Sequence, residues 1–442
     1  MFFTPTLWMP TSGESGWSPS LANATLSEDY VAGSYVNNGV QASSSGTWTN
    51  SAGKYIINSS GVLQRVTSGI PLNHSWNGSS ATALGLLLEG ANTNYMANSN
   101  NFGTGGWVSN APNWGSAPTV AQTATGPDGV TNSAWSWTST NTNGIPGDTF
   151  DHSGVGGWMS IYAKAGNVNY LVLSQGALSN AYYFDLVTGV ATAGTGNANG
   201  STMKMEQLAN GWWRCSGYCN GGIFGIGAVS AVNGTGTSGN QIFVYGAQFD
   251  YQGTVNPGPS SYHPTSGSTA TRPADSFTFP TALTETILKN GPGTAFINVE
   301  LYSLDQSAGG GAGLISNASA SWSGRESILD ISPTPTLESD SVTPFAYNIS
   351  APASVPAIGA TIKAAVAFSH EIGGQTALNG TAGTLTAGWV SFSPATFGFA
   401  PHFDLGPGNN YATIGGYLNG HVRQFALWPI AASQAQLVSL TT

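Results

Sequence analysis

Short runs of β-branched and aromatic residues recur along this chain between clusters of Gly, Asn and Ser, and helical periodicity is almost absent. Runs of this length, bounded by turn-forming residues, are typical of strands in sandwiches and barrels. The pattern therefore predicts an all-β fold, and 442 residues are enough for two or three domains. The best examples are Trp158–Lys164, Tyr170–Ser174, Ala181–Leu186, Gly222–Val232 and Gln241–Asp250.

The last of these runs has the two-residue alternation of a strand. Regular alternation places two sets of side chains on opposite faces. One set is Phe243, Tyr245, Ala247 and Phe249, and the other is Val244, Gly246 and Gln248.

One helix is indicated, at the end of the chain. Ser433 and Gln436 form an S-x-x-Q capping box in front of Leu437 and Leu440. This spacing predicts a short C-terminal helix of about two turns.

Charged residues make up 7% of the chain, against roughly 25% in a typical soluble domain. The 14 Trp, 16 Tyr and 18 Phe nevertheless predict a folded chain. The net charge of −10 argues against nucleic acid or an anionic membrane as a partner. Neither a transmembrane helix nor a secretory signal peptide is expected, because no long apolar run and no basic N-terminal region are present.

Cys215 and Cys219 are the only cysteines, and they lie four residues apart in a predicted strand. That spacing separates their Cα atoms by about 13 Å, whereas a disulfide allows roughly 7 Å. The partners of a zinc site are also missing from the pattern. We therefore expect two buried thiols in a fold that is stable without disulfides.

A polar, proline-rich stretch over 254–275 is typical of an extended linker. A second change occurs near residue 84, where the apolar LGLLLEG follows a polar stretch. These changes predict an N-terminal attachment segment (1–83), a central domain (84–255), a linker (256–275) and a C-terminal domain (276–442).

The sequence favours a protein that is not an enzyme. Nothing pairs two of the 20 acidic residues as a glycosidase requires, and no G-x-S-x-G motif is present. The G-x-G-x-x-G match at Gly234–Gly239 is flanked by strand-like sequence, so we interpret it as a hairpin loop and not a phosphate site.

Two groups of polar residues could bind a hard cation or supply acid–base groups, although a polar loop is the favoured interpretation of each. No cofactor is expected, and calcium is left open in either sandwich. The groups are Asp148, Asp151 and His152, and Asp404, Asn409 and Asn410.

Five tryptophans lie among amide and hydroxyl residues, and these are candidates for stacking on sugar rings: Trp107, Trp114, Trp135, Trp137 and Trp389. For any single one, a place in the core or in a subunit interface is the favoured alternative. Trp135 and Trp137 share one face of a predicted strand. Trp212 or Trp213 should pack in the core, since only one face of their strand points inward.

Three groups of motifs follow one another along the chain. The first is Gly85–Asn94 (GLLLEGANTN), preceded by Gly61–Leu63. The second comprises Asn98-Ser99 with Trp107, Pro127–Gly129, Tyr162–Gly166, Phe184–Leu186 with Gly189-Val190, Gly211–Arg214, Tyr245–Gln248, Tyr262–Thr265 and Thr271–Asp275. The third is Gly416–Arg423 with Trp428-Pro429.

In this order, over residues 40 to 442, the motifs resemble a family of tailed-bacteriophage virion proteins described as head-spike or tail-fibre proteins. The resemblance implies a jelly roll like that of carbohydrate-binding modules in the centre, and a laminin-G-like, concanavalin-like sandwich at the C-terminus. The chain departs from the family at Asn92, where Arg is usual, and at Phe249-Asp250, where Leu-Glu is usual. Neither change touches the fold, and the first removes a charge that could form a local salt bridge.

The function that the resemblance implies is that of a virion structural protein, assembled in the host cytoplasm and forming a homotrimer. The N-terminal segment would bind capsid or tail proteins, with the first forty residues outside the resemblance as the docking candidate. The two sandwiches would bind host-surface polysaccharide. The alternatives are a capsid decoration or cement protein that binds no sugar and, less favoured, a capsule depolymerase.

Overall fold

The structure is a computed structural model, and it divides into two compact units. Unit 1 comprises residues 1–49, 84–90 and 274–442, and unit 2 comprises residues 50–83 and 91–273. The residues that the structure describes are 19–37, 40–103, 107, 117–140, 149–151, 156–175, 181–195, 197, 202–219, 223–250, 258–279, 292–303, 312–317, 326–331, 337–341, 349–350, 359–369, 373–385, 403–404 and 419–442.

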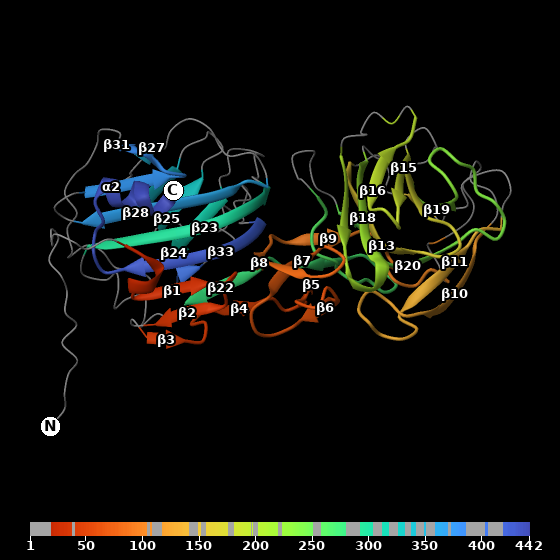
Figure 1. Cartoon of the computed structure of the whole chain (residues 1–442), viewed down its shortest axis with the longest axis horizontal. Helices are drawn as coiled ribbons and strands as arrows, with labels where there is room; N and C mark the ends of the chain where they lie inside the picture. The colour runs from red at the N-terminus through yellow and green to blue at the C-terminus, as the bar shows by residue number, and fades with distance from the viewer. Residues whose placement is uncertain are drawn as a thin grey trace, which may run out of the picture. The chain divides into compact units, whose positions relative to one another are not determined.

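The prediction of an all-β fold is confirmed, and all the paired strands in the described ranges run antiparallel (Figure 1). The expected strands are present, with ends that differ from the predicted ones by a few residues. These expected strands are β13 (Gly157–Ala165), β14 (Tyr170–Gln175), β15 (Ala181–Asp185), β19 (Ile223–Val229) and β20 (Gln241–Asp250).

No helix in the described ranges is long and apolar enough to cross a membrane.

Unit 2 is a sandwich of two sheets. The larger sheet has the order β10 (Thr119–Ala124), β11 (Ala134–Thr138), β20, β13, β18 (Trp212–Cys219) and β17 (Met203–Gln207), and β9 (Asn92–Asn94) joins β20 to β21 (Ala270–Arg272). The smaller sheet has the order β12 (Thr149–Asp151), β19, β14, β15 and β16 (Val190–Ala193).

One continuous apolar core fills the space between these sheets. Ile161 and Ala163 on β13 belong to it, as do Leu171 and Leu173 on β14. Cys215 and Cys219 also lie in it, both fully buried and unbridged, so the prediction of two buried thiols is confirmed. Burial raises the pKa of the Cys215 thiol well above its ordinary value.

The outer face of the larger sheet carries a second apolar cluster. A hairpin of β5 (Lys54–Ile57) and β6 (Leu63–Val66) covers this face. Leu63 packs there with Tyr162, Tyr245 and Tyr262, and Tyr55 lies edge-on to Tyr262 with ring centroids 5.2 Å apart. The chain itself therefore fills a sheet face that would otherwise be open.

The prediction of a regular two-residue alternation along β20 is wrong, because the strand contains a bulge. Tyr162 is opposite Tyr245 and Ser160 is opposite Gln248, so two residues of β20, Gly246 and Ala247, oppose one residue of β13. Val244 and Ala247 consequently face the same inner core, whereas Tyr245 faces the outer cluster. Gly246 has φ +59°, the left-handed conformation that a bulge of this kind places on glycine.

The two units do not follow the predicted domain boundaries. Residues 258–273 of the proposed linker pack into unit 2, where Tyr262 is 1% exposed and β21 pairs with β9. The proposed N-terminal segment is divided, because its first strands belong to unit 1 and residues 50–83 belong to unit 2. A proline-rich sequence favours an extended linker, but hydrogen bonds and the burial of aromatic side chains hold this segment in the fold.

Unit 1 also contains two sheets. One has the order β3 (Val40–Ala42), β2 (Ser34–Asn37), β1 (Leu26–Asp29), β33 (Asn419–Trp428), β23 (Gly293–Ser303), β28 (Thr361–Ser369), β29 (Gly373–Leu378) and β30 (Thr381–Ala382), and Leu86–Leu88 of β8 (Ala81–Leu88) pair with β33. The strand β7 (Leu72–Trp76) lies in unit 2. The other sheet has the order β26 (Leu337–Ser341), β25 (Glu326–Ile331), β24 (Ala312–Asn317), β32 (Phe403–Asp404), β22 (Ser276–Phe279) and β4 (Thr47–Thr49). A further pair is β27 (Ile349–Ser350) with β31 (Thr384–Leu385).

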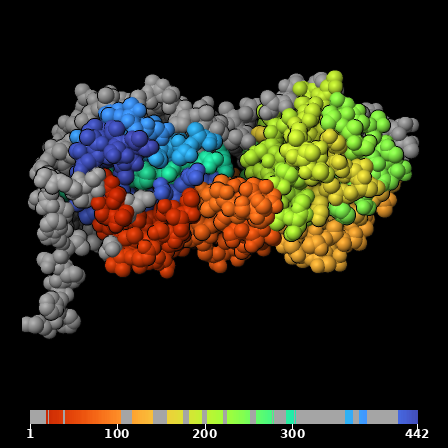
Figure 2. All heavy atoms as spheres, in the orientation of Figure 1, coloured from red at the N-terminus to blue at the C-terminus, as the bar shows by residue number. Residues whose placement is uncertain are grey.

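The first and last strands of the chain pair with each other in unit 1. Leu26 lies opposite Leu427 and Asp29 lies opposite Gln424. The red N-terminal and blue C-terminal segments consequently run side by side in Figures 1 and 2.

The predicted C-terminal helix is confirmed as α2 (Gln434–Thr441). Its capping box is formed in both directions: the Gln436 amide donates to Ser433 Oγ at 3.4 Å, and the Ser433 amide donates to Gln436 Oε1 at 2.8 Å. Leu437 is buried against the face of the first sheet, beside Phe296 and Trp428. The local cap and the apolar anchor together fix this helix in place.

The pairing of β1 encloses a carboxyl group, that of Glu28. Its side chain is 0% exposed, and Oε1 accepts a hydrogen bond from the Ser45 amide at 2.7 Å. Burial raises the pKa of Glu28 to about 7, and hydrogen bonds from Ser44 and Ser45 offset only part of that effect. Folding therefore favours the protonated form.

We predict that unit 1 loses stability as the pH rises from about 4.5 to about 7, the interval between the unfolded and folded pKa values of Glu28. The loss should be on the order of 3 kcal/mol, and Glu28→Gln should remove it, because Gln resembles the neutral acid. Denaturant unfolding at pH 4.5 and 8, with hydrogen exchange at β1, measures the effect. Glu206→Gln, at a half-exposed ion pair, is the control. Equal pH dependence in wild type and Glu28→Gln would contradict this account.

A second prediction concerns the bulge in β20. A Cβ at Gly246 would lie 2.9 Å from the Tyr262 ring, in addition to the cost of φ +59° for an L side chain. Gly239 has φ +89° with open space around it, so Gly239→Ala isolates the backbone cost of about 1–2 kcal/mol. Gly246→Ala should lower the free energy of unfolding by clearly more than Gly239→Ala. Equal losses in chemical denaturation would show that the close packing of Tyr262 contributes nothing.

Candidate functional site: an aromatic edge of unit 2

Three of the five candidate tryptophans come together in unit 2. Trp107, Trp135 and Trp137 surround Phe102, with ring centroids 4.7, 6.3 and 6.1 Å from it, respectively. We call Phe102, Trp107, Trp135 and Trp137 the aromatic edge, because Trp135 and Trp137 lie on β11, next to the edge strand β10 (Figure 1). Trp114 and Trp389 lie outside the residues that the structure describes.

Trp107 and Trp135 are half-buried, and both indoles are anchored to the same loop. Trp107 Nε1 donates to the carbonyl oxygen of Asn98 at 2.7 Å, and Trp135 Nε1 donates to that of Asn100 at 2.9 Å. Gly103 lies against the Trp135 ring, where a Cβ would be only 3.0 Å away. The N–H groups are therefore used internally, and only ring surface is left for a ligand.

Trp137 does not fit the predicted role. It shares the inner face of β11 with Trp135, as expected, but it is 0% exposed and belongs to the inner core. A ring without solvent-accessible surface cannot stack on a sugar, so the alternative of a place in the core holds for this residue.

The loop that anchors the indoles is itself fixed by hydrogen bonds. Asn100 donates to the Ser133 carbonyl at 3.2 Å and accepts from the Gly246 amide at 3.1 Å. Ser99 is fully buried, and its hydroxyl lies 2.9 Å from the Tyr262 hydroxyl. Asn98 Oδ1 accepts from the Gly267 amide at 2.9 Å. The aromatic edge is thus a pre-organised surface on a rigid sandwich.

The other tryptophan pair divides between the two sheet faces. Trp212 is buried in the outer cluster, whereas Trp213 is half-buried and packs against the inner core. Trp213 Nε1 donates to the Leu186 carbonyl at 2.9 Å, and its ring lies against Gly189. One of the two was expected in the core, and Trp212 fulfils that expectation, although in the outer cluster.

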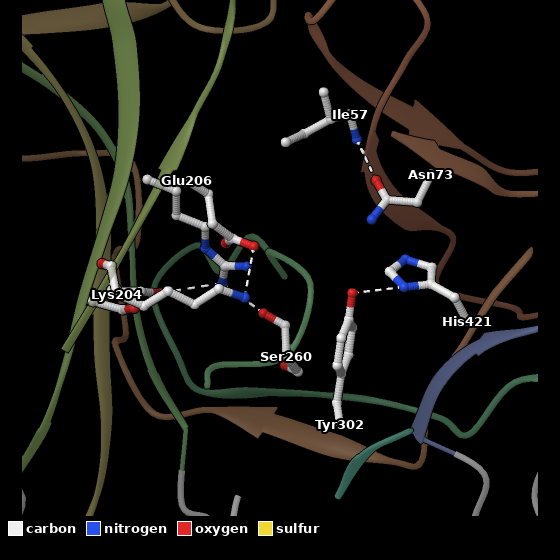
Figure 3. A network of polar contacts seen from close by, with 10 residues as sticks. Ile57, Asn73, Lys204, Glu206, Ser260, Tyr302 and His421 are labelled. Carbon is white, nitrogen blue, oxygen red and sulfur yellow. Dashed lines mark hydrogen bonds and ion pairs between the residues drawn. The ribbon is translucent and has the colours of Figure 1, made fainter. Parts of the chain in front are cut away.

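A buried polar cluster, which the sequence did not indicate, lies elsewhere in unit 2. Asp250 Oδ2 accepts from Gln248 Nε2 at 2.9 Å and from the Ser260 amide at 2.7 Å. Arg214 donates to the Ser260 carbonyl at 2.5 Å and lies over the Tyr162 ring. Ser260 is labelled in Figure 3. A buried position at the end of β20 was readable from the sequence, but its partners were not.

The pKa values in this cluster are shifted by burial. Burial raises the pKa of Asp250 to about 6, against the hydrogen bond from Gln248 and the charge of Arg214. Burial lowers the pKa of His263 to about 4, helped by the positive charges of Arg272 and Arg65. His263 is thus neutral at physiological pH. These groups face the interior, and their evident role is to hold residues 258–265 against the sheet.

Unit 1 contains a buried histidine with a defined partner. His421 on β33 is 0% exposed, and its Nδ1 lies 2.6 Å from the Tyr302 hydroxyl (Figure 3). The two rings meet edge-on, with centroids 4.9 Å apart. His421 belongs to the third motif group, and its contact explains that motif through packing within the sheet.

The first motif group and the Thr271–Asp275 motif also have structural roles. In unit 2, Asn92 on β9 lies opposite Arg272 on β21, and Arg272 is fully buried. In unit 1, the Glu89 amide donates to Asp275 Oδ2 at 2.7 Å, and Trp48 Nε1 donates to Asp275 Oδ1 at 3.2 Å.

The remaining candidates add no site. The Gly234–Gly239 segment is a loop between strands, as predicted, but β19 and β20 belong to different sheets, so it is not a hairpin. Asp151 lies in β12 and Asp404 in β32, and their neighbours Asp148, His152, Asn409 and Asn410 lie outside the described ranges. Within those ranges, no three His, Cys, Asp or Glu side chains gather as a metal site would require.

No protein-family model matches the sequence, and the comparison with characterised proteins gives no match. Among solved structures, the carbohydrate-binding module CBM40 of the Ruminococcus gnavus IT-sialidase, bound to α2,3-sialyllactose, aligns with a TM-score of 0.30 and 15% identity over 36% of this chain and 86% of that one.

Two sialidases also align. The NanB sialidase of Streptococcus pneumoniae has a TM-score of 0.30 and 12% identity over 37% of this chain and 26% of that one. The Trypanosoma rangeli sialidase has a TM-score of 0.29 and 13% identity over 38% and 26%.

The buried polar cluster generates a prediction about Asp250. At pH 5 its carboxyl is mainly neutral, so Asp250→Asn keeps both shape and charge and should cost less than about 1 kcal/mol. Asp250→Ala removes the acceptor of the buried Ser260 amide and one of the acceptors of Gln248 Nε2, and it should cost about 2–4 kcal/mol. Denaturant titrations of both variants test this. Equal losses would mean that Oδ2 does not anchor residues 258–265.

Proposed function

We propose that this chain is a non-enzymatic structural protein of a tailed-bacteriophage virion, a head-spike or tail-fibre subunit that binds host-surface glycans. The observation that carries the adhesive part is the pair of half-buried indoles at the aromatic edge, fixed by hydrogen bonds to Asn98 and Asn100. Flat aromatic surfaces held in place are suited to stacking on sugar rings. The virion part rests on the ordered motif series.

The proposed attachment to capsid or tail proteins belongs to the N-terminal end of the chain. Residues 26–29 and 34–37 form β1 and β2 within the sheet of unit 1, so they serve as part of the displayed fold. The earliest residues, 1–18, lie outside the described part. A homotrimer is the oligomer that the resemblance implies.

Glycan-array binding by the purified full chain tests the adhesive function. We expect binding to a subset of bacterial surface polysaccharides, with no release of reducing ends on prolonged incubation. Release of reducing ends would identify a depolymerase. Binding no higher than background, together with loss of capsid stability when the protein is deleted, would identify a cement protein. Immunogold labelling of intact particles tests the virion location independently.

A further inference from the structure

We propose that the aromatic edge binds uncharged sugar residues, such as neutral hexoses or N-acetylhexosamines, and discriminates against acidic saccharides. This inference rests on the proposed glycan-binding function and names its ligand class. Three features support it. The indole N–H groups are hydrogen-bonded within the fold, the neighbouring Asn side chains are hydrogen-bonded within the fold, and the Lys and Arg side chains of unit 2 lie elsewhere.

The first feature is that ring surface is what the aromatic edge offers. The indole N–H groups of Trp107 and Trp135 are used by backbone carbonyls, so neither indole has an N–H to donate to a sugar hydroxyl or a carboxylate. Both residues are only partly buried. A ligand is therefore held mainly by contact between aromatic rings and the C–H faces of a sugar, and such contact needs no charge.

The second feature is that the nearby amides are engaged within the fold. Asn100 uses both its amide donor and its acceptor. Asn98 Oδ1 accepts from Gly267, and Asn101 Oδ1 accepts from Gly103 at 3.3 Å. These side chains position the rings. With the oxygens of Asn98, Asn100 and Asn101 already engaged, recognition of a class of sugars fits better than recognition of one epimer.

The third feature is the distribution of charge. No Lys or Arg occurs from Ala91 to Ala163, the segment that builds the aromatic edge. Its charged residues include Asp128, which accepts from Ser133 Oγ at 2.6 Å and from the Val130 amide. An acidic sugar would therefore find no Lys or Arg of this segment to pair with, in a chain of net charge −10.

The cations of unit 2 all lie elsewhere. Lys204 is on β17, at the opposite edge of the sheet from β10 and β11. Lys164 is opposite Phe243, which packs on the outer face, whereas Trp135 is opposite Val244, which faces the inner core. The others are Lys54, Arg214 and Arg272, which are buried, and Arg65, on the outer hairpin, which donates to the Ala52 carbonyl.

The experiment compares neutral and acidic oligosaccharides on the full chain. The probes are cello-, malto- and chito-oligosaccharides on one side, and sialyllactose and oligogalacturonate on the other. We expect binding to one or more neutral probes that is unchanged between 50 and 500 mM salt, because no ion pair contributes. Trp107→Ala and Trp135→Ala should each weaken it about tenfold.

Trp213→Ala is the matched control, because Trp213 is also half-buried and anchored through its N–H to a backbone carbonyl in the same unit. It should leave binding unchanged. Where an alanine variant fails to fold by circular dichroism, Trp107→Phe and Trp135→Phe keep a ring and should retain most of the binding. The comparison of neutral and acidic probes on the wild-type protein tests the inference even if none of the variants folds.

Two results would overturn the inference and leave the proposed function intact: preferential binding of the acidic probes, or neutral binding that Trp107→Ala and Trp135→Ala leave unchanged. Absence of binding to every glycan on the array would overturn the inference and the adhesive function together.

Discussion

Antiparallel pairing between strands from distant parts of the sequence is the interaction on which both units depend. β1 pairs with β33 across almost the whole chain, and β9 pairs with β21 across most of unit 2. Closing such long loops costs conformational entropy, and Cys215 and Cys219 form no disulfide that would restrain the unfolded chain. The hydrogen bonds between strands and the burial of apolar faces must therefore offset this loss of conformational entropy. The larger sheet of each unit is therefore complete only when segments far apart in the sequence are in place.

Because charged residues are scarce, buried polar groups in these units are satisfied mainly by uncharged partners. Hydroxyls and amides take the place of ion pairs, as in the bonds of Asn94 to the His263 carbonyl and of Ser260 to Asp250. A buried carboxyl is expensive to ionise, and burial therefore raises the pKa values of Glu28 and Asp250, the latter in spite of the charge of Arg214. Motif residues such as Ser99 and Asp275 belong to this internal network and build the scaffold. Trp107, from the second motif group, is instead part of the aromatic edge.

That scaffold determines where unit 2 can meet a ligand. The outer face of its larger sheet is filled by the β5–β6 hairpin and the tyrosine cluster, so aromatic surface on that face is already used. The aromatic edge differs, because the loop through Asn98 and Asn100 orients two rings without covering them fully. Rigid support lowers the entropy lost when a ligand binds. A neutral, ring-stacking function and a charge-poor sequence are thus consistent with each other.

The sequence by itself determined the features that depend on neighbouring residues. Strand positions follow from β-branched and aromatic runs between turn residues, the Ser433–Gln436 cap specifies α2, and a four-residue spacing along one strand keeps the two thiols apart. Only the tertiary structure decided the rest. The bulge at Gly246 depends on β13 and on the Tyr262 ring, and the burial of Trp137 depends on the facing sheet. Residues 258–275 fold back because partners far away in sequence satisfy their polar groups. Local propensity carries no information about such partners, and their contacts separate a core tryptophan from one that can meet a sugar.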